Sequence, residues 1–410
     1  MDNLFLVLNA GSSSLKFSLY QMPEEIEIVN GNIEKIGSTD SIFSIKTKEI
    51  KIEENVPIQT HFEAVQKMLY VLSRNHFVNS LNDIKAVGHR IVHGGDKYRD
   101  SVLIDEVVMM NIESLKNLVP LHVPAELTII NSIEKILNVP QVAVFDTSFH
   151  QTIPEENFMY ALPYEFYQNN GVRKYGFHGT SHKYITEEMK KRLNKEDVNL
   201  IICHLGNGSS VTAIKDGKSF NTSMGLTPLD GIVMGTRSGS IDPSIISYIA
   251  SEKGMNIKEI LHELNNNSGL KGICGKIDIR DILSLVEQGD PKAILAIKML
   301  EKSIIKYISN YYFELEGKID GLVFTAGIGE NAMSIREDII NSIGPVMGMK
   351  IDNKKNNSIA KYLDNKEGVI TTEDSNINAY VIPTNEEVMI LRDTYRLAFN
   401  YEYKNNKRVS

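Results

Sequence analysis

Short apolar runs alternate along the chain with longer segments whose apolar residues recur with the period of a helix. The short runs lie at residues 4–8, 15–20, 141–148, 199–205 and 320–327 and are rich in Val, Leu, Ile and Phe. Runs of this length and composition are typical of strands buried inside a sheet. Their alternation with helical segments predicts an α/β protein. The last three runs end on small or polar residues, and α/β proteins usually bind their ligands at such strand ends.

Three helices are marked by the residues at their ends. An Asp-Pro pair begins and a Gly ends each of the first two, at residues 242–254 and 290–317, and a third begins at 385. The second contains AILAIKMLEKSIIKYISNYYFEL, which is too apolar for a helix surrounded by water. We therefore expect this helix to pack between domains or against a partner subunit.

Two similar hairpin patterns occur about half a chain apart. A Gly-Ser-Ser triplet at 11–13 lies between LFLVLN and LKFSLY, and a second at 208–210 lies between NLIICHL and VTAI. The second is followed by another hairpin signal, Asp-Gly at 216–217. A chain of 410 residues is too long for one ordinary core. The repeated pattern therefore predicts two domains that arose by duplication.

Composition and charge narrow the classes of function. The apolar share of 42% and the charged share of 23% are those of a globular protein. A net charge of −8 argues against a nucleic-acid surface, although local Arg and Lys can still bind a small anion. The N-terminal segment carries an acid where a signal peptide needs bases, and no apolar stretch reaches the ~20 residues of a membrane span. We expect a cytoplasmic protein without membrane or nucleic-acid partners.

The two cysteines, Cys203 and Cys274, lack the spacing of a zinc site or of a disulfide framework. Both lie in apolar or Gly-rich surroundings. We expect two buried free thiols.

The Gly/Ser turns are candidate anion sites. Such a turn exposes several backbone N–H groups beside hydroxyl donors, and Lys16 follows the first turn closely. An ordinary β-turn remains the alternative for each turn taken alone. No GxxxxGK[ST] precedes a helix, which disfavours P-loop proteins.

The segment GLVFTAGIGEN at 321–331 is a third candidate, in which a strand and a Gly-rich turn precede a helix from about Ser334. Position 332 is Ala, so a Rossmann fingerprint is incomplete. This turn can instead admit a base or a ribose against bare backbone.

Four further residues are candidates for chemistry on anions. Arg90 and Arg237 lie among glycines, where a guanidinium can approach a phosphate or a carboxylate closely. His178 lies just before a predicted helix start at Thr180 or Ser181, and Asp146 follows a buried run. A solvated surface position for each Arg, a structural role for the His and a capping role for the Asp are the alternatives.

Eight motifs together resemble a known family. In chain order they are NAGSSSLKF, GHRIVHGG, FDTSFH, YGFHGTSH, HLGNGSS, MGTRSG, FTAGIGEN and PTNEE. Their order and spacing, from residue 6 to about 395, are similar to those of the acetate kinases. The resemblance implies an α/β fold of two duplicated actin-like, ribonuclease H-like domains with a nucleotide cleft between them. These would be an acyl-kinase domain (1–149 with the C-terminal helix at 386–410) and a nucleotide-binding domain (150–385).

The resemblance also implies a reaction and its participants. ATP and acetate would give ADP and acetyl phosphate reversibly, with Mg²⁺ (or Mn²⁺), in a homodimer that takes part in acetyl-CoA biosynthesis. The catalytic residues would be Arg90, Asp146, His178 and Arg237, with Asn9 and Glu386 at the metal and Val92, Leu121, Phe177 and Pro228 around the methyl group. The phosphates would meet Ser12, Ser14, Lys16, His204, Leu205, Gly206, Asn207 and Gly208. Adenosine would meet Asp278, Ile279, Arg280, Gly327, Ile328, Gly329, Glu330 and Asn331.

Chemical reasoning supports this set. A carboxylic acid with a pKa of about 4 is already ionised at neutral pH, so no base is needed to deprotonate it. The difficulty is to bring two anions together and to stabilise charge on the transferring group, for which two Arg, one His and a metal ion are suited. The sequence departs from the family pattern at Asp96 (usually Glu), Val123 (usually Asn) and Ser240 (often Asp). The last two departures affect the fine positioning of the substrate.

Two alternatives remain open at this point. A propionate or butyrate kinase would need a roomier acyl pocket than Val92 leaves, although one methylene is worth only about 1–3 kcal/mol. A non-enzymatic nucleotide switch of the same superfamily would share the hairpins. It would not need Arg90, His178 and Arg237 together.

Overall fold

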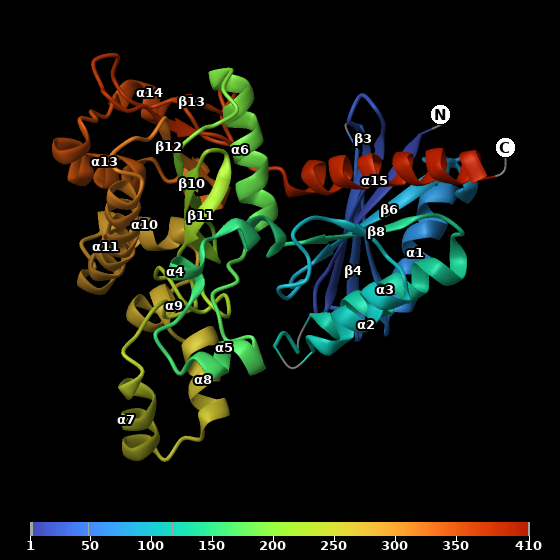
Figure 1. Cartoon of the computed structure of the whole chain (residues 1–410), viewed down its shortest axis with the longest axis horizontal. Helices are drawn as coiled ribbons and strands as arrows, with labels where there is room; N and C mark the ends of the chain where they lie inside the picture. The colour runs from blue at the N-terminus through green and yellow to red at the C-terminus, as the bar shows by residue number, and fades with distance from the viewer. Residues whose placement is uncertain (1–2, 48, 117, 121, 409–410) are drawn as a thin grey trace. The chain divides into compact units, whose positions relative to one another are not determined.

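The structure is a computed structural model that describes residues 3–47, 49–116, 118–120 and 122–408. It divides into two compact units, one formed by Met1–Phe149 with Asn385–Ser410 and the other by His150–Thr384. Within the described residues, each unit contains one mixed sheet with helices packed on it (Figure 1). The predicted α/β class is confirmed. No helix of the described part is long and apolar enough to cross a bilayer.

The first unit is built on a sheet with the strand order β5-β4-β3-β2-β1-β6-β8-β7. The strands are β1 (Leu4–Ala10), β2 (Ser14–Gln21), β3 (Ile26–Glu34), β4 (Ser38–Lys46), β5 (Lys51–Ile58), β6 (Ile84–Ile91), β7 (Val102–Leu103) and β8 (Gln141–Phe145). The helices are α1 (His61–Arg74), η1 (Leu81–Asp83), α2 (Glu106–Ser114), α3 (Val123–Ile136) and α15 (Glu386–Arg408), and η2 (Ser148–Thr152) begins at the end of this unit.

Helices cover both faces of this sheet because its central strand is apolar on both. In β1, Leu4, Leu6 and Leu8 join a core cluster with residues of α1 and α3. Phe5 lies one step out of phase and its ring meets that of Tyr395 in α15, with centroids 5.4 Å apart. Successive strand residues point to opposite faces, so α15 covers the face opposite to α1 and α3 (Figure 1).

The second unit is built on a sheet with the order β11-β10-β9-β12-β14-β13. The strands are β9 (Leu200–Leu205), β10 (Ser209–Lys215), β11 (Lys218–Thr222), β12 (Gly321–Thr325), β13 (Gly368–Val369) and β14 (Ala379–Val381). The helices are α4 (Glu155–Phe158), α5 (Tyr164–Asn170), α6 (Gly179–Leu193), α7 (Ser244–Lys253), α8 (Ile257–Asn266), α9 (Gly269–Cys274), α10 (Ile279–Glu287), α11 (Pro291–Glu314), α12 (Ala326–Asn331), α13 (Met333–Met347) and α14 (Asn353–Asn357).

The second sheet is also covered on both faces. Ile201 and Cys203 of β9 belong to the core cluster that includes the inner face of α11. His204 is out of phase with them, and its Nδ1 lies 2.8 Å from Ser181 Oγ in α6. Figure 1 shows α6 and α11 on the two sides of this sheet. The apolar α11 therefore packs on a sheet of its own unit, which accounts for its composition; Leu295 and Met299 on its outer side are exposed.

The two sheets repeat one topology. In each, a central strand is antiparallel to the next strand of its hairpin and parallel to a later strand: β1 pairs with β2 and β6, and β9 pairs with β10 and β12. The series β3-β2-β1-β6-β8 thus corresponds to β11-β10-β9-β12-β14. This repeat confirms the duplication that the paired hairpins predicted.

Several local expectations need correction. The strand expected over 141–148 ends at Phe145, and the strand expected over 320–327 ends at Thr325. Residues 326–331, expected as the end of that strand and a turn, form the short helix α12. The two Gly-Ser-Ser triplets are not equivalent: residues 11–13 lie in the loop of the first hairpin, whereas Ser209 and Ser210 already belong to β10. Cys203 is buried as expected, but Cys274 is only half-buried.

Candidate active site

Three polar side chains form a row across the first sheet. Asn9 of β1 lies directly opposite Lys16 of β2 on one side and Arg90 of β6 on the other. Residues that pair directly across strands point to the same face. This face is the one that α15 covers, and that helix begins with Glu386. The sheet register thus gathers residues that lie far apart in the sequence.

Arg90 and Asp146 form a bidentate ion pair at the end of this row. Because β8 runs parallel to β6, Asp146 follows β8 just beside the end of β6. Arg90 Nε donates to Asp146 Oδ1 at 3.2 Å, Nη2 donates to Oδ2, and Nη1 donates to Asn9 Oδ1 at 3.2 Å. Burial lowers the pKa of Arg90, but the charges of Asp146 and Glu386 outweigh burial and raise it. The guanidinium is therefore a permanent, oriented cation.

Glu386 adds a second carboxylate to this cluster. Burial and the neighbouring charge of Asp146 raise the pKa of Glu386 to about 7, against the opposing charges of Arg90 and Lys16. The side chain of Asn385 accepts a hydrogen bond from Val388 N at 3.1 Å and so fixes the first turn of α15. A buried carboxylate with a second carboxylate beside it is stabilised by a cation.

The donor set of this cluster fits Mg²⁺. The described residues contain no group of three or more His, Cys, Asp or Glu that could hold a metal by themselves. Mg²⁺ does not require such a group, because it is usually bound by one or two carboxylates, several waters and the phosphates of its ligand. Glu386 and the amide oxygen of Asn9 supply hard oxygen ligands of the kind that this ion prefers.

The first Gly/Ser turn lies beside this row. Gly11 N donates to Ser14 O at 2.8 Å and closes the loop. The side chains of Ser12 and Lys16 are exposed, and Ser14 is half-buried. The turn therefore presents hydroxyl and ammonium donors to solvent, as an anion site needs.

A buried carboxylate behind the row was missed by sequence reasoning. Glu126 of α3 is 2% exposed; its Oε1 accepts the backbone N–H of Val92 at 2.9 Å, and its Oε2 has no hydrogen-bond partner among the described residues. Burial raises its pKa to about 7, while Val92 N–H and the charge of Arg90 act in the opposite direction. Glu126 thus fixes the backbone of Val92 immediately after β6.

In the second unit, His178 occupies the position just before α6 in a left-handed conformation, with φ 56°. A non-glycine residue in this region is strained, and such strain is common at functional sites. The segment is held from behind: His150, which is fully buried, lies with Nε2 2.9 Å from the carbonyl oxygen of Phe177. Burial lowers the pKa of His150 to about 4, so this ring is neutral near pH 7.

His178 and Arg237 converge above Gly208. A Cβ atom built on Gly208 would lie 3.4 Å from His178 Nε2 and 3.2 Å from Arg237 Nη1. Arg237 Nη1 also donates to the carbonyl oxygen of Pro228 at 3.4 Å, and burial lowers the pKa of Arg237. The space that glycine leaves open is therefore bordered by two nitrogen donors.

The second Gly/Ser turn is closed by its own side chains. Ser209 Oγ donates to Gly206 O at 2.9 Å and accepts from Gly206 N at 3.0 Å. Asn207 at the tip is exposed, and Leu205 before it is buried. His204 stacks on His178 with ring centroids 4.2 Å apart. The turn thus joins the pair of donors over Gly208 to the pocket described next.

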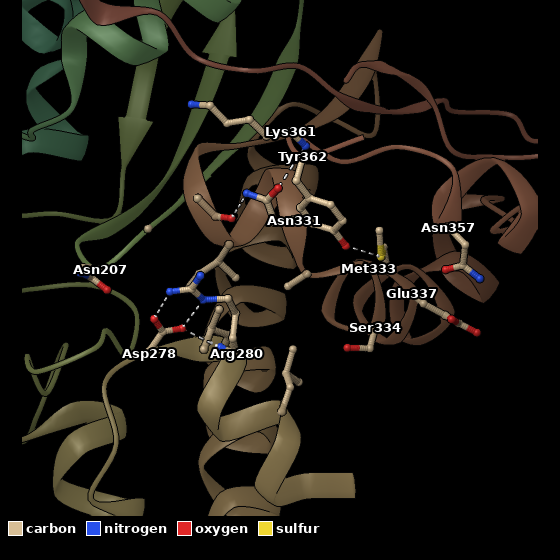
Figure 2. Close-up of a pocket in the computed structure, with 16 residues that line it drawn as sticks. Asn207, Asp278, Arg280, Asn331, Met333, Ser334, Glu337, Asn357, Lys361 and Tyr362 are labelled. Atoms are coloured by element: carbon tan, nitrogen blue, oxygen red, sulfur yellow. Dashed lines mark hydrogen bonds and ion pairs between the residues drawn. The ribbon is translucent and has the colours of Figure 1, made fainter. Parts of the chain in front are cut away.

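A pocket of about 1020 Å³ opens beside this turn. Figure 2 shows side chains that reach it from α10, from α13 and from the segment after α14. The predicted residues that line it are Gly206, Asn207, Asp278, Ile279, Arg280, Gly327, Ile328 and Asn331. Sequence reasoning missed the others, which include Met333, Ser334, Glu337, Asn357, Lys361 and Tyr362. The pocket is large enough for a nucleoside with its phosphates.

Hydrogen bonds preorganise two walls of the pocket. Asp278 receives two hydrogen bonds from the Arg280 guanidinium, which lower the pKa of this carboxyl to about 2 (Figure 2). On the other wall, Asn331 donates to Gly327 O at 2.8 Å and accepts from Lys361 N at 3.0 Å. These bonds hold a planar guanidinium on one wall and fix the backbone of the other.

Of the residues predicted to meet adenosine, two lie outside the lining of this pocket. Gly329 packs on β12, since a Cβ there would be 3.3 Å from the carbonyl carbon of Phe324. Glu330 is 1% exposed, and its Oε1 accepts the backbone N–H of Thr384 at 3.2 Å. Both therefore support α12 from behind.

The family is shown by comparison with known proteins. The model of the acetokinase family matches residues 4–392. The chain belongs to the acetokinase family. Among its relatives in this family, the acetate kinase of Acholeplasma laidlawii is 50% identical over 395 residues, which are 96% of this chain and 98% of that protein. The acetate kinase of Bacillus mycoides is 48% identical over 396 residues, with the same coverage.

Solved structures of acetokinases agree with this assignment. The structure of a propionate kinase from Francisella tularensis has a TM-score of 0.90 and 44% identity, and covers 97% of this chain and 100% of that chain. An acetate kinase structure from Porphyromonas gingivalis has a TM-score of 0.90 and 38% identity, and covers 96% and 99%. These likenesses confirm the actin-like fold that the resemblance implied.

The residues expected around the methyl group of the acceptor, and the three departures from the family pattern, are distributed over both units. Val92 is 5% exposed and Phe177 2%, and Pro228 is half-buried. Leu121 lies outside the described residues. Of the three departures from the family pattern, Asp96 is exposed, Val123 is buried as the first residue of α3, and Ser240 donates to Asp230 Oδ1 at 2.6 Å.

Proposed function

We propose that this chain transfers the γ-phosphoryl group of ATP reversibly to acetate, giving acetyl phosphate and ADP. It is a phosphotransferase with a carboxyl group as acceptor. The observation that carries the proposal is the convergence of His178 Nε2 and Arg237 Nη1 above Gly208. Two donors aimed at one point suit the equatorial oxygens of a phosphoryl group in transfer.

The first unit supplies a second cation for the approach of two anions. Arg90 would bind the acetate carboxylate or the transferring group, and its two bonds to Asp146 would keep the guanidinium in one orientation. Asp146 acts as the orienting partner, since acetate needs no base to lose a proton at neutral pH. His178 and Arg237 would stabilise the charge that develops on the phosphoryl oxygens.

The metal ion of the reaction would be Mg²⁺, with Mn²⁺ as a substitute. Glu386 and Asn9 would hold it through oxygen atoms and water. When bound, the ion neutralises charge on the phosphates. Ser12, Ser14 and Lys16 on the neighbouring turn would add donors to the same phosphates.

The nucleotide would lie in the pocket of the second unit. The phosphates would meet the turn from His204 to Gly208, and the base and ribose would lie between Arg280 and the backbone of Gly327. This assigns nucleotide binding to residues 150–385 and acyl chemistry to residues 1–149 with 386–410. A homodimer located in the cytoplasm completes the proposal.

The resemblance to the family assigns Val92, Leu121, Phe177 and Pro228 to the methyl group of the acceptor. Val92, a branched residue held by Glu126, favours the short acetate chain. Propionate is the second candidate acceptor, and the likeness to a propionate kinase from F. tularensis gives this alternative weight. A methylene is worth only about 1–3 kcal/mol in such a pocket, so we expect both acids to react, acetate faster.

The test is acetate-dependent release of ADP by the purified chain with ATP and Mg²⁺, together with trapping of acetyl phosphate as the hydroxamate. Acetate, propionate and butyrate are compared side by side. We expect turnover with acetate and the loss of turnover in Arg237→Ala. Binding of ATP without acid-dependent ADP release would reject the kinase proposal in favour of a nucleotide switch.

A further inference from the structure

Ser210 belongs to the second Gly-Ser-Ser triplet, yet its hydroxyl does not reach the turn. Leu205 pairs with Ser209 at the closing rung of the hairpin, and His204 pairs with Ser210 one rung further into the sheet. Ser210 is 0% exposed. Its hydroxyl therefore cannot serve as an anion donor at the turn, which is the role that the sequence pattern predicted for such serines.

The hydroxyl of Ser210 instead lies between two histidines. Ser210 Oγ is 3.0 Å from His178 Nδ1 and 2.8 Å from His182 Nε2. His182 Nε2 is also 3.0 Å from Thr212 Oγ1. A hydroxyl has one proton to donate, so the protonation of His182 decides in which direction Ser210 points it.

His182 must carry its proton on Nε2. The ring is fully buried, burial lowers its pKa well below 6.5, and it is therefore neutral. Its Nδ1 has no hydrogen-bond partner among the described residues. A buried N–H without an acceptor is costly and rare, so the proton belongs on Nε2, where Ser210 Oγ and Thr212 Oγ1 can accept it.

The direction of the chain of hydrogen bonds then follows. His182 Nε2–H donates to Ser210 Oγ, so the Ser210 O–H is available to donate to His178 Nδ1. A ring that accepts at Nδ1 carries its own proton on Nε2. His178 Nε2 is the atom that faces the space above Gly208 next to Arg237 Nη1.

We infer that Ser210, backed by His182, is a positioning residue that fixes His178 in the Nε2–H form with this N–H aimed over Gly208. This inference rests on the proposed donor role of His178. Without Ser210 the imidazole could rotate or hold its proton on Nδ1, and a lone pair on Nε2 would then face the anionic phosphoryl group. Partners of this kind, which orient a site residue from behind, typically change activity by about 10–100-fold when they are removed.

The kinetic test compares Ser210→Ala with Ser209→Ala on the adjacent position. Ser210→Ala should lower kcat about 10–100-fold with little change in KM for ATP. His182 Nε2–H keeps Thr212 Oγ1 as an acceptor in this variant, so the fold should persist. Ser209→Ala removes the hydroxyl that closes the turn at Gly206 and should instead raise KM for ATP. Ser210→Thr, which restores a hydroxyl, should recover most of kcat.

A spectroscopic test does not depend on activity. The protein is labelled with ¹⁵N-histidine, and the NMR signals of the His178 ring nitrogens are assigned by their loss in His178→Gln. In the parent chain their chemical shifts should be those of the Nε2–H form. In Ser210→Ala the shifts should move toward those of a mixture of the two forms. A wild-type His178 with its proton on Nδ1 overturns the inference, as does a Ser210→Ala chain with wild-type ring shifts and wild-type kcat. A chain that shows the expected ring shifts but no acyl phosphate formation leaves the inference standing and rejects the proposed function.

Discussion

Arg90 donates hydrogen bonds from Nε and Nη2 to the two carboxylate oxygens of Asp146, which is 2% exposed. The same guanidinium also donates to Asn9 Oδ1. Arg90 therefore compensates a buried charge in addition to its proposed role in binding substrate. Arg237 differs, since within its own unit its Nη1 donates to the carbonyl oxygen of Pro228 and to the sulfur of Met234.

This difference predicts unequal effects of two alanine substitutions. Arg90→Ala and Arg237→Ala should each lower kcat by at least about 10²-fold, because each removes a donor that we propose acts on the transition state. Arg90→Ala should also lower the free energy of unfolding by about 2–4 kcal/mol, since the buried carboxylate of Asp146 loses both hydrogen bonds and the compensating charge of Arg90. Arg237→Ala should change it by less than about 1 kcal/mol. Urea unfolding and hydroxamate assays of both variants check these predictions. Equal losses of stability in the two variants would contradict the structural role of Arg90 as the partner of Asp146.

Gly208→Ala should separate activity from stability. The added Cβ would sit 3.2 Å from Arg237 Nη1 and 3.4 Å from His178 Nε2, in the space proposed for the phosphoryl group. We expect kcat to fall about 10²-fold, since small displacements at reacting atoms are costly. The backbone of Gly208 does not require a positive φ, so stability should be unchanged or higher by up to about 1 kcal/mol.

Gly235→Ala is the matched control for this substitution. Its Cβ would meet Ile277 Cγ2 at 3.3 Å and Asn207 O at the ordinary contact distance of 3.6 Å, and neither His178 nor Arg237 is among its three nearest atoms. It should retain kcat. Loss of activity in both variants to the same extent would mean that crowding of the loops, and not the space above Gly208, is responsible.

Substitutions of two glycines in α12 should have different effects, one on nucleotide binding and the other on stability. A Cβ on Gly327 meets nothing within 4 Å and points into the open pocket, whereas one on Gly329 comes within 3.3 Å of the Phe324 backbone. Gly327→Leu should therefore raise KM for ATP without lowering the thermal midpoint, and Gly329→Ala should lower the midpoint. A nucleotide KM that is insensitive to Gly327→Leu would place the base elsewhere.

The sequence predicted those elements whose ends are determined locally. The helices α7 and α11 begin within one residue of the positions that their Asp-Pro pairs indicate, and Gly254 adopts the left-handed conformation that ends α7. The helix α11 ends at Glu314, three residues before the Gly317 that the sequence indicated. Residues 326–331 were predicted as a turn because two glycines are poor helix formers. The helix α12 forms there because Ile328 is buried in the core of the second unit, which no local pattern indicates.

The candidate site was predictable only where a motif carried it. Arg90, Asp146 and Glu386 are named by motifs, and the sheet register brings them together. Glu126 was missed, because a buried carboxylate in a helix gives no signal until the fold places it behind Val92. Ser210 was included in the predicted anion turn, because the triplet pattern does not show that this serine already belongs to β10 and lies behind His178. Lys361 and Tyr362 reach the pocket from a segment whose sequence has no turn or strand pattern of its own.

Val92→Ala should change the choice of acceptor. Removing two methyl groups from the wall of the proposed acyl pocket should raise the ratio of kcat/KM for propionate over acetate by about 10-fold. Val87→Ala on β6 is the matched control: Val87 is fully buried in the core, so this variant should lose stability without changing the ratio. An unchanged ratio in Val92→Ala would remove Val92 from the acyl pocket.

Glu126→Gln should make the chain more stable at high pH. The folded-state pKa of Glu126, about 7, lies above its ordinary value of 4.5, so the folded chain holds the proton more tightly than the unfolded chain does. As the pH rises from about 4.5 to 7, the unfolded chain releases this proton first, and the free energy of unfolding falls. Above pH 7 the buried carboxylate is ionised in the folded chain as well, and the free energy of unfolding stays at its lowered value.

Gln cannot ionise but can still accept the N–H of Val92 through its Oε1. At pH 8 we therefore expect Glu126→Gln to have a free energy of unfolding about 1–3 kcal/mol above that of the parent chain, with the difference shrinking toward zero near pH 5. Urea unfolding of the two chains across this pH range measures it. The ratio of kcat/KM for acetate over propionate should be the same in Glu126→Gln as in the parent chain. Glu126→Ala leaves the N–H of Val92 without its acceptor and should therefore change this ratio. A Glu126→Gln chain less stable than the parent at pH 8 would show that an ionised Glu126 is stabilised by its surroundings, contrary to the raised pKa.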